Sequence, residues 1–321
     1  MPNVTVHLWL AERTLERWAL HPELSPFPLA SVRVCQAFQQ GALGPDLGYF
    51  PGGERFLSDL SHKVRSGELT RSLLMEAREP EERAFAWGWV THVLADRLVH
   101  PIVARGVGYL VTGDPDRAIS GEEDLPGHVR VETGIDAWIS ARYPHLASTR
   151  LVPVFHDGGL AFLHRAYLTT YGFRIPYDAL GRSYLRMLRM GTGALRSISW
   201  LARGRDEVEG TPGPLTRPVN GILGWLARNR VPGSLALNYL SPVDPPRWLQ
   251  RELQEVAAGF TDRVMAVAAD PMGELPDVNL DTGRPDSGSG PLQLSGRELP
   301  GWAVPASLPA RGLPPAAVME S

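Results

Sequence analysis

The sequence predicts an all-α protein that ends in a flexible tail. Apolar residues recur mainly at spacings of three and four residues, which gathers them on one face of a helix. No convincing run of alternating apolar and polar residues indicates a β-strand. From Pro271 onward, prolines and glycines recur without a period, and only scattered apolar residues remain. We therefore expect a helical domain over residues 1–270 and a tail over residues 271–321, because the tail cannot bury enough surface to offset its ordering entropy.

Helices are expected near residues 5–20, 27–40, 54–65, 68–78, 81–100, 126–142, 157–171, 177–203, 217–229 and 246–268. The clearest interruptions are rich in glycine and proline and cover residues 41–53, 106–127 and 207–218. The first of these should be an ordered loop. Pro101 should end the helix over 81–100, because proline lacks the N–H that continues a helix.

Composition restricts the class of protein. Hydrophobic residues make up 43% and charged residues 21%, which is the balance of a globular protein. The net charge of -3 argues against stable nucleic-acid binding. Cys35 is the single cysteine, so no internal disulfide is expected. No apolar run approaches the roughly 20 residues that span a bilayer, and no signal peptide is visible, so we expect a cytoplasmic protein without a transmembrane segment.

The strongest chemical pattern lies in FAWGWVTHVLADRLVHP, where His92, Asp96 and His100 follow at four-residue intervals. A helix rises about 1.5 Å per residue, so these side chains form one stripe at steps of about 6 Å. Phe85 and Trp89 lie near the same stripe, which indicates that it faces the interior. A buried imidazole or carboxylate costs several kcal/mol unless it is paired or binds a metal. The stripe therefore predicts a metal site.

Further donors accompany this stripe. His128 and Glu132 repeat the four-residue spacing, Asp46 lies in the first loop, His62 lies on the following helix, and His7 lies on the first helix. One histidine beside an acid is usually a surface ion pair, and Asp46 alone would be a turn residue. Three separate groups of nitrogen and oxygen donors together favour a metal. Imidazole and carboxylate suit zinc, although iron and manganese accept the same donors.

These residues resemble the zinc-dependent phospholipases C and their relatives, the single-strand-specific fungal nucleases. The resemblance covers roughly residues 4–140 and rests on the order His, Asp, His, HxxxD, His, HxxxE. It implies a single all-α domain that holds three zinc ions. By position, the first zinc would take Asp46, His62, His92 and Asp96; the second would take His100, His128 and Glu132; His7 would hold the third together with Asp96, which bridges.

The sequence departs from this family in two places. His100 follows Asp96 by four residues, whereas the secreted enzymes space the corresponding pair by six. Those enzymes also complete the third site with the amine and carbonyl of an N-terminal tryptophan. Here removal of Met1 would leave the amine of Pro2, five residues before His7. Both two and three ions are therefore compatible with the sequence.

The expected function is hydrolysis of a phosphoester by metal-activated water. A cluster of divalent ions lowers the pKa of a bound water and stabilises charge on the leaving oxygen. Asp46 is the candidate general base, because a loop carboxylate at the edge of the cluster can reach that water. The substrate would be a phospholipid head group or another intracellular phosphoester. The alternatives are a nuclease of the same fold and a non-catalytic, metal-stabilised binding protein.

The remaining polar and amphipathic features each allow a structural interpretation beside a functional one. Asp59 either orients the imidazole of His62 or is a solvated carboxylate. The segment Arg217–Val231 either makes peripheral contact with a lipid surface or docks its apolar face on the protein. Three histidines outside the pattern are expected to be structural or exposed: His145, His156 and His164.

Overall fold

The computed structural model describes residues 4–156, 159–172, 174–206 and 241–284. Within these ranges the protein is helical and contains no β-sheet, which confirms the predicted fold class. The α-helices are α1 (Val4–Leu20), α2 (Val32–Gly41), α3 (Arg55–Lys63), α4 (Ser66–Glu76), α5 (Pro80–Thr112), α6 (Leu125–Arg142), α7 (Ala161–Tyr171), α8 (Tyr177–Asp206) and α11 (Arg247–Ala269). Short 3₁₀ turns cover Pro22–Leu24, Gly44–Asp46 and Pro144–Ser148.

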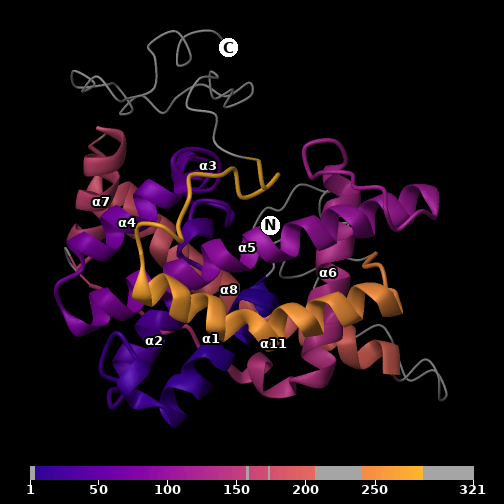
Figure 1. Cartoon of the computed structure of the whole chain (residues 1–321), viewed down its shortest axis with the longest axis horizontal. Helices are drawn as coiled ribbons and strands as arrows, with labels where there is room; N and C mark the ends of the chain where they lie inside the picture. Colours follow the sequence, from indigo (N-terminus) through magenta and orange to yellow (C-terminus); the bar gives the residue numbers. More distant parts are fainter. Residues whose placement is uncertain (1–3, 157–158, 173, 207–240, 285–321) are drawn as a thin grey trace, which may run out of the picture.

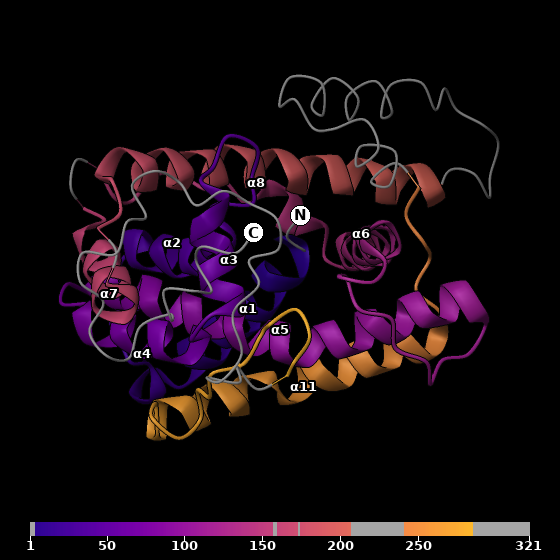
Figure 2. The same cartoon turned by 90° about the horizontal axis from the view of Figure 1, so that it is seen from above.

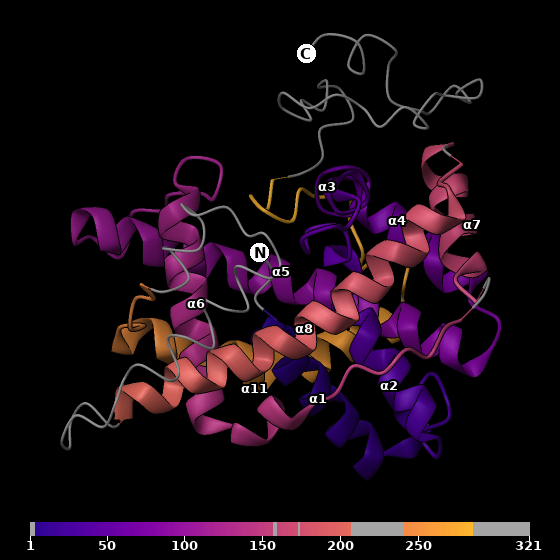
Figure 3. The ribbon, with the colours of Figure 1, turned by 180° about the vertical axis from the view of Figure 1, so that it is seen from behind.

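Helix α5 runs through the middle of the molecule and contacts α1, α2, α4, α6 and α11. Figure 2 shows α8 on one side of the body and α11 on the opposite side, with α1 and α5 between them. The same arrangement is visible in Figures 1 and 3, where α11 and α8 respectively lie nearest the viewer. Side chains on α5 are therefore surrounded by helices from early and late parts of the sequence.

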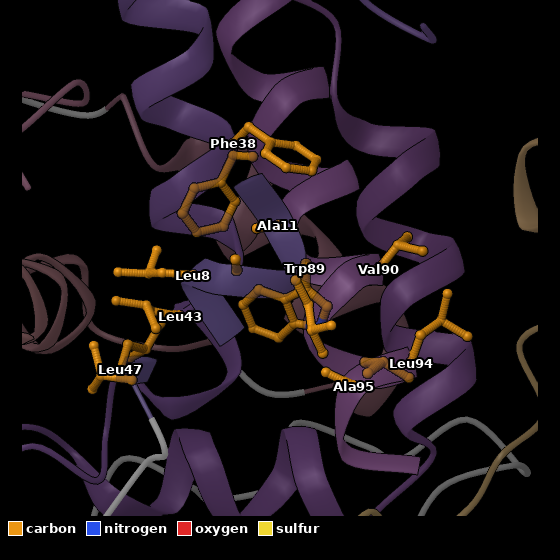
Figure 4. Close-up of a cluster of buried hydrophobic side chains, with 14 of the residues drawn as sticks. Leu8, Ala11, Phe38, Leu43, Leu47, Trp89, Val90, Leu94 and Ala95 are labelled. Carbon is orange, nitrogen blue, oxygen red and sulfur yellow. The ribbon is translucent and has the colours of Figure 1, made fainter. Parts of the chain in front are cut away.

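The central core joins α1, α2 and α5 to the loop that follows α2. Figure 4 shows Leu8 from α1, Phe38 from α2 and Trp89 from α5 close to Leu43 and Leu47 of the loop. All five side chains are almost fully buried. Burying an apolar side chain of this size contributes about 1.5–3 kcal/mol. These contacts fix the glycine-rich loop against α5, as expected for an ordered loop.

Helices α2 and α5 approach each other at two glycines. A Cβ atom built on Gly88 would lie 2.0 Å from the carbonyl oxygen of Phe38, and one built on Gly41 would lie 2.0 Å from that of Phe85. No larger residue fits either position without moving backbone. The close approach brings the end of α2, at Ala42, next to the polar stripe of α5.

Helix α5 does not end at Pro101, contrary to the sequence prediction. It begins at a capping box formed by Glu79 and Glu82 and continues to Thr112. A proline inside a helix costs about 3 kcal/mol, because one backbone hydrogen bond is lost. The residues that follow offset this cost, since Val103 and Val107 are fully buried in the core. The pyrrolidine ring of Pro101 is exposed, so it displaces no neighbouring helix.

The chain remains packed on the helices beyond residue 270, within the range that the sequence assigns to the tail. Leu275 and Leu280 are fully buried, and Val278 is nearly so. These three apolar residues are enough to hold residues 275–280 on the helices, which the average composition of the tail conceals. Residues 285–321 and the helix expected over 217–229 lie outside the described residues.

The close contact between α2 and α5 gives a testable prediction. Gly88→Ala should lower the free energy of unfolding by about 1–3 kcal/mol, because the new methyl group meets the backbone of α2. The matched control is Gly181→Ala on α8, where a Cβ meets no atom within 4 Å. That variant should gain about 0.5–1 kcal/mol from helix propensity. Urea unfolding measures both, and equal stabilities would contradict the close approach.

Candidate metal centre

The eight residues that the sequence singles out lie in one cluster. They come from α1, the 3₁₀ turn after α2, α3, α5 and α6. Six are at least nine-tenths buried, and His100 and His128 are the most exposed of the eight. Their donor atoms form three adjoining groups: His7, His92 and Asp96; Asp46, His62 and His92; and His100, His128 and Glu132.

Asp46, His62 and His92, together with Asp96, surround a point between α3, α5 and the loop after α2. His62 Nε2 lies 3.3 Å from His92 Nε2 and 3.3 Å from Asp46 Oδ1. Asp96 Oδ2 lies 3.4 Å from His62 Nε2 and 3.1 Å from His92 Nε2. Tetrahedral zinc with bonds of about 2.0–2.1 Å separates its ligand atoms by about 3.3–3.4 Å. His92 Nε2 lies farther from Asp46, at 3.9 Å from Oδ2. The other four separations are close to those between the ligands of one ion.

The protonation of the two imidazoles follows from their other ring nitrogens. His62 Nδ1 lies 2.8 Å from the carbonyl oxygen of Ser58, and His92 Nδ1 lies 2.9 Å from that of Ala42. A carbonyl oxygen can only accept, so each Nδ1 carries a proton and donates it. In a neutral imidazole the Nε2 atom is then a bare lone pair. Although burial alone would lower it, hydrogen bonds to Asp46 and Asp96 raise the pKa of His62 well above its usual value, so without a metal its Nε2 also carries a proton. A bound cation would take the place of that proton between the imidazoles and the two carboxylates.

The group of His100, His128 and Glu132 lies between α5 and α6. His128 Nε2 is 3.1 Å from Glu132 Oε1, and His100 Nε2 is 3.7 Å from the same oxygen. His100 Nε2 is also 3.6 Å from Asp96 Oδ1, which joins this group to the donors around His62 and His92. His100 Nδ1 donates to the carbonyl oxygen of Leu280 at 2.6 Å. The four-residue spacing of His128 and Glu132 thus produces the shared face that the sequence predicts.

His7 reaches the cluster from the first turns of α1. Its Nε2 atom lies 3.3 Å from Asp96 Oδ1, and its ring stacks on that of His92 with the centroids 3.9 Å apart. Burial, with the neighbouring His92, lowers the pKa of His7 to about 3. The ring is therefore neutral and offers a lone pair. The amine of Pro2, which would complete a third site, lies outside the described residues.

Asp136 holds α1 in place, and the sequence analysis missed it. Its carboxylate accepts the backbone N–H groups of Thr5 at 3.3 Å and Val6 at 3.1 Å. These are donors at the start of α1, where a helix has no partners of its own. Asp136 follows Glu132 by one further four-residue step, and this extension of the pattern was the available signal.

The carboxylates of the cluster are ionised despite their burial. Burial alone would raise the pKa of Asp96, but the neighbouring His92 and His100 outweigh it and hold that pKa well below its usual value. The pKa of Asp46 is lowered by His92 and His62, again against burial. The pKa of Glu132 is lowered in the same way by His128. The same carboxylates raise the pKa values of His62 and His100, although burial alone would lower them. Three buried anions that draw protons onto neighbouring imidazoles fit a set of divalent cations that would take the place of those protons.

Several buried atoms of the cluster have no hydrogen-bond partner among the described residues. They are His7 Nδ1, Asp46 Oδ2, Asp96 Oδ2 and His128 Nδ1. A buried polar atom without a partner costs about 1–3 kcal/mol. Metal ions and the water bound to them would satisfy such oxygen atoms, so the donor set fits metals rather than a network of protein hydrogen bonds.

An all-α body that buries adjoining histidine and carboxylate groups defines a class of metal-dependent proteins. The family model for zinc-dependent phospholipase C matches residues 6–186, more than half of the chain, and the protein belongs to this family. The matched range contains all eight cluster residues, whereas α11 and residues 275–284 lie beyond it. Comparison with curated proteins and with solved structures gave no match.

Other residues noted in the sequence lie away from the cluster or act differently. Asp59 does not orient His62, because it accepts from Tyr49 Oη at 3.2 Å and pairs with Arg55. The carbonyl of Ser58 takes the role expected of Asp59. The four remaining histidines join no donor group: His21 lies 3.4 Å from Glu23, His145 pairs with Glu12, His156 is exposed, and His164 stacks on Tyr177.

The shared position of Asp96 predicts that Asp96→Asn is the most damaging single substitution in the cluster. The amide keeps the shape but removes the charge that opposes repulsion between neighbouring cations. We expect metal affinity to fall at least tenfold, since even partners outside the ligand set are worth about 10–100-fold. Elemental analysis after dialysis measures this loss. His145→Ala is the control and should keep its metal; equal metal loss in the two variants would remove α5 from the site.

Proposed function

We propose that the protein is a zinc-dependent phosphoester hydrolase that carries two or three ions in the cluster. The observation that carries this proposal is the position of Asp96 between donor groups, with one oxygen facing His62 and His92 and the other facing His7 and His100. Adjacent divalent ions, when bound, activate water and stabilise charge on the leaving oxygen of a phosphoester. Membership of the zinc-dependent phospholipase C family supports the same chemistry.

Within this proposal, Asp46 is the general base. Its Oδ1 atom faces His62 at 3.3 Å, whereas Oδ2 has no hydrogen-bond partner among the described residues. The carboxylate can therefore use one oxygen as a ligand and the other to accept a proton from water. Its lowered pKa keeps it ionised near neutral pH, although that pKa also makes it a weak base. Its contribution is therefore mainly one of position.

We propose a phospholipid head group or another phosphoester of similar size as the substrate, because the family name points to lipid phosphoesters. None of the helices in the described part of the chain is long and apolar enough to cross a membrane. Access to lipid would therefore require contact with the surface of a bilayer. The segment Arg217–Val231, for which the sequence leaves open either lipid contact or docking on the protein, lies outside the described residues.

The proposed activity is tested with zinc-loaded protein on four substrates: a chromogenic phosphomonoester, a chromogenic phosphodiester, phosphatidylcholine vesicles and single-stranded DNA. We expect hydrolysis of at least one phosphoester, its loss after chelation and its return with zinc. Cleavage of DNA alone would identify a nuclease. No hydrolysis by fully loaded protein, or hydrolysis that persists after complete removal of metal, would contradict the proposal.

The role of Asp46 is tested with Asp46→Asn, which keeps a ligand oxygen but cannot accept a proton. We expect kcat per bound zinc to fall about 10²–10⁴-fold, the usual contribution of general acid–base catalysis. Zinc content is measured on the same samples, so that loss of metal and loss of the base are separated. An unchanged rate per bound zinc would exclude Asp46 as the base and leave it a ligand only.

A further inference from the structure

Residues Glu274–Arg284 follow α11 and are called the C-terminal strap below. In Figure 1 the strap leaves the end of α11 and runs past α4 toward α3. It lies outside the range matched by the family model. The family resemblance therefore says nothing about it, and its role must be argued from its contacts.

The first half of the strap is anchored to α4 and α5 by polar contacts. Gly67 makes room for it, since a Cβ there would lie 2.2 Å from the carbonyl oxygen of Leu275. The anchoring contacts are Arg97 Nη1 to Glu274 O at 3.1 Å, Arg71 to Leu275 O, Glu68 N to Asp277 Oδ1 at 2.8 Å, and Ser66 Oγ to Val278 O at 2.6 Å.

The second half of the strap reaches the metal centre at Leu280. The backbone N–H of Leu280 donates to the carbonyl oxygen of His62 at 2.7 Å. Its own carbonyl oxygen accepts from His100 Nδ1 at 2.6 Å. One strap residue thus contacts two histidines that belong to different donor groups. The Leu280 side chain is fully buried, which fixes the position of this backbone.

A tight turn holds the strap in this position. Asn279 Oδ1 accepts from the backbone N–H groups of Asp281 at 2.9 Å and Thr282 at 3.2 Å. Gly283, with φ of 67°, lets the chain reverse so that Asn279 N donates to Arg284 O at 2.9 Å. Asp281 then pairs with Lys63 at 3.4 Å, which ties the turn to the end of α3.

The hydrogen bond to Leu280 fixes the orientation of the His100 ring and which of its nitrogens faces the cluster. Because a carbonyl oxygen only accepts, His100 Nδ1 carries a proton, and Nε2 is the atom that faces Asp96 and Glu132 and would offer its lone pair to a metal. His62 and His92 obtain the same fixing from carbonyls of Ser58 and Ala42, within the matched range. His100 obtains it from a segment 180 residues away in the chain.

We propose that the C-terminal strap is a positioning element of the metal centre, in which the carbonyl of Leu280 sets the tautomer and orientation of His100. The proposal rests on the proposed function only in that the group of His100, His128 and Glu132 binds a metal. It also explains how His100 can serve although its spacing from Asp96 is shorter than in the secreted enzymes.

The test uses the full-length, zinc-loaded protein with variants of the strap. Asp277→Ala removes the acceptor for Glu68 N and the partner of Arg71, both remote from the cluster. Asp277→Asn keeps the acceptor for Glu68 N and should therefore behave almost like the wild type. Leu280→Pro removes the N–H that donates to His62 O. The matched control is Asp178→Ala, which breaks an exposed ion pair with Arg182 on α8.

We expect Asp277→Ala and Leu280→Pro to release one class of zinc to a chelator at least about tenfold faster, the lower end of the effect of partners outside the ligand set. The remaining zinc, and all zinc in Asp178→Ala, should leave at the wild-type rate. The cobalt-substituted variants should show an altered visible spectrum. Nitrogen NMR shifts of His100 should show protonated Nδ1 in the wild type and a mixture of tautomers in the variants.

Wild-type release rates and an unchanged His100 tautomer in both strap variants would overturn the proposal. Equal loss of all ions together with cooperative unfolding would also overturn it, since the strap would then be structural only. The tautomer measurement is made on the zinc-loaded protein and does not need activity. If it and the selective release behave as expected while no phosphoester is hydrolysed, the proposed function fails and the role of the strap stands.

Discussion

The burial of Asp96 on α5 is the constraint on which the rest of the structure depends. Four imidazoles approach its two oxygens, at 3.1 Å from His92, 3.3 Å from His7, 3.4 Å from His62 and 3.6 Å from His100. Burial disfavours the ionised carboxylate, but His92, His100 and His62 hold its pKa well below the usual value. Leaving such a charge without partners would cost about 3–5 kcal/mol. Each element that carries a partner must therefore be held tightly against α5.

Contacts that involve the backbone hold these elements against α5. Gly41 and Gly88 let α2 touch α5, and this contact brings the carbonyl of Ala42 within 2.9 Å of His92 Nδ1. Asp136 fixes the first turn of α1 and with it the approach of His7. The imidazole rings of His62, His92 and His100 are thus oriented by backbone carbonyls of the fold.

The shared face of His92, Asp96 and His100 could be predicted from the sequence, whereas the groups that hold these side chains in place could not. The spacing of His92, Asp96 and His100 is a helical period, so their common face follows from sequence alone. The carbonyls of Ser58 and Ala42 leave no trace in residue identity, since every residue carries a carbonyl. The end of α5 was misplaced because a local rule about proline yields to tertiary packing of the residues beyond it.

The C-terminal strap shows the same limit more strongly. Its average composition resembles a disordered tail, yet Leu275, Val278 and Leu280 provide enough apolar burial to order it. Once those side chains are buried, the backbone between them must find hydrogen-bond partners. It finds them on α4, at His62 of α3 and at His100 of α5. A carbonyl that would otherwise be an unsatisfied buried acceptor instead fixes His100. The need to satisfy the backbone of a late segment and the need to orient an early ligand are met by one hydrogen bond, which links the stability of the strap to the geometry of the metal centre.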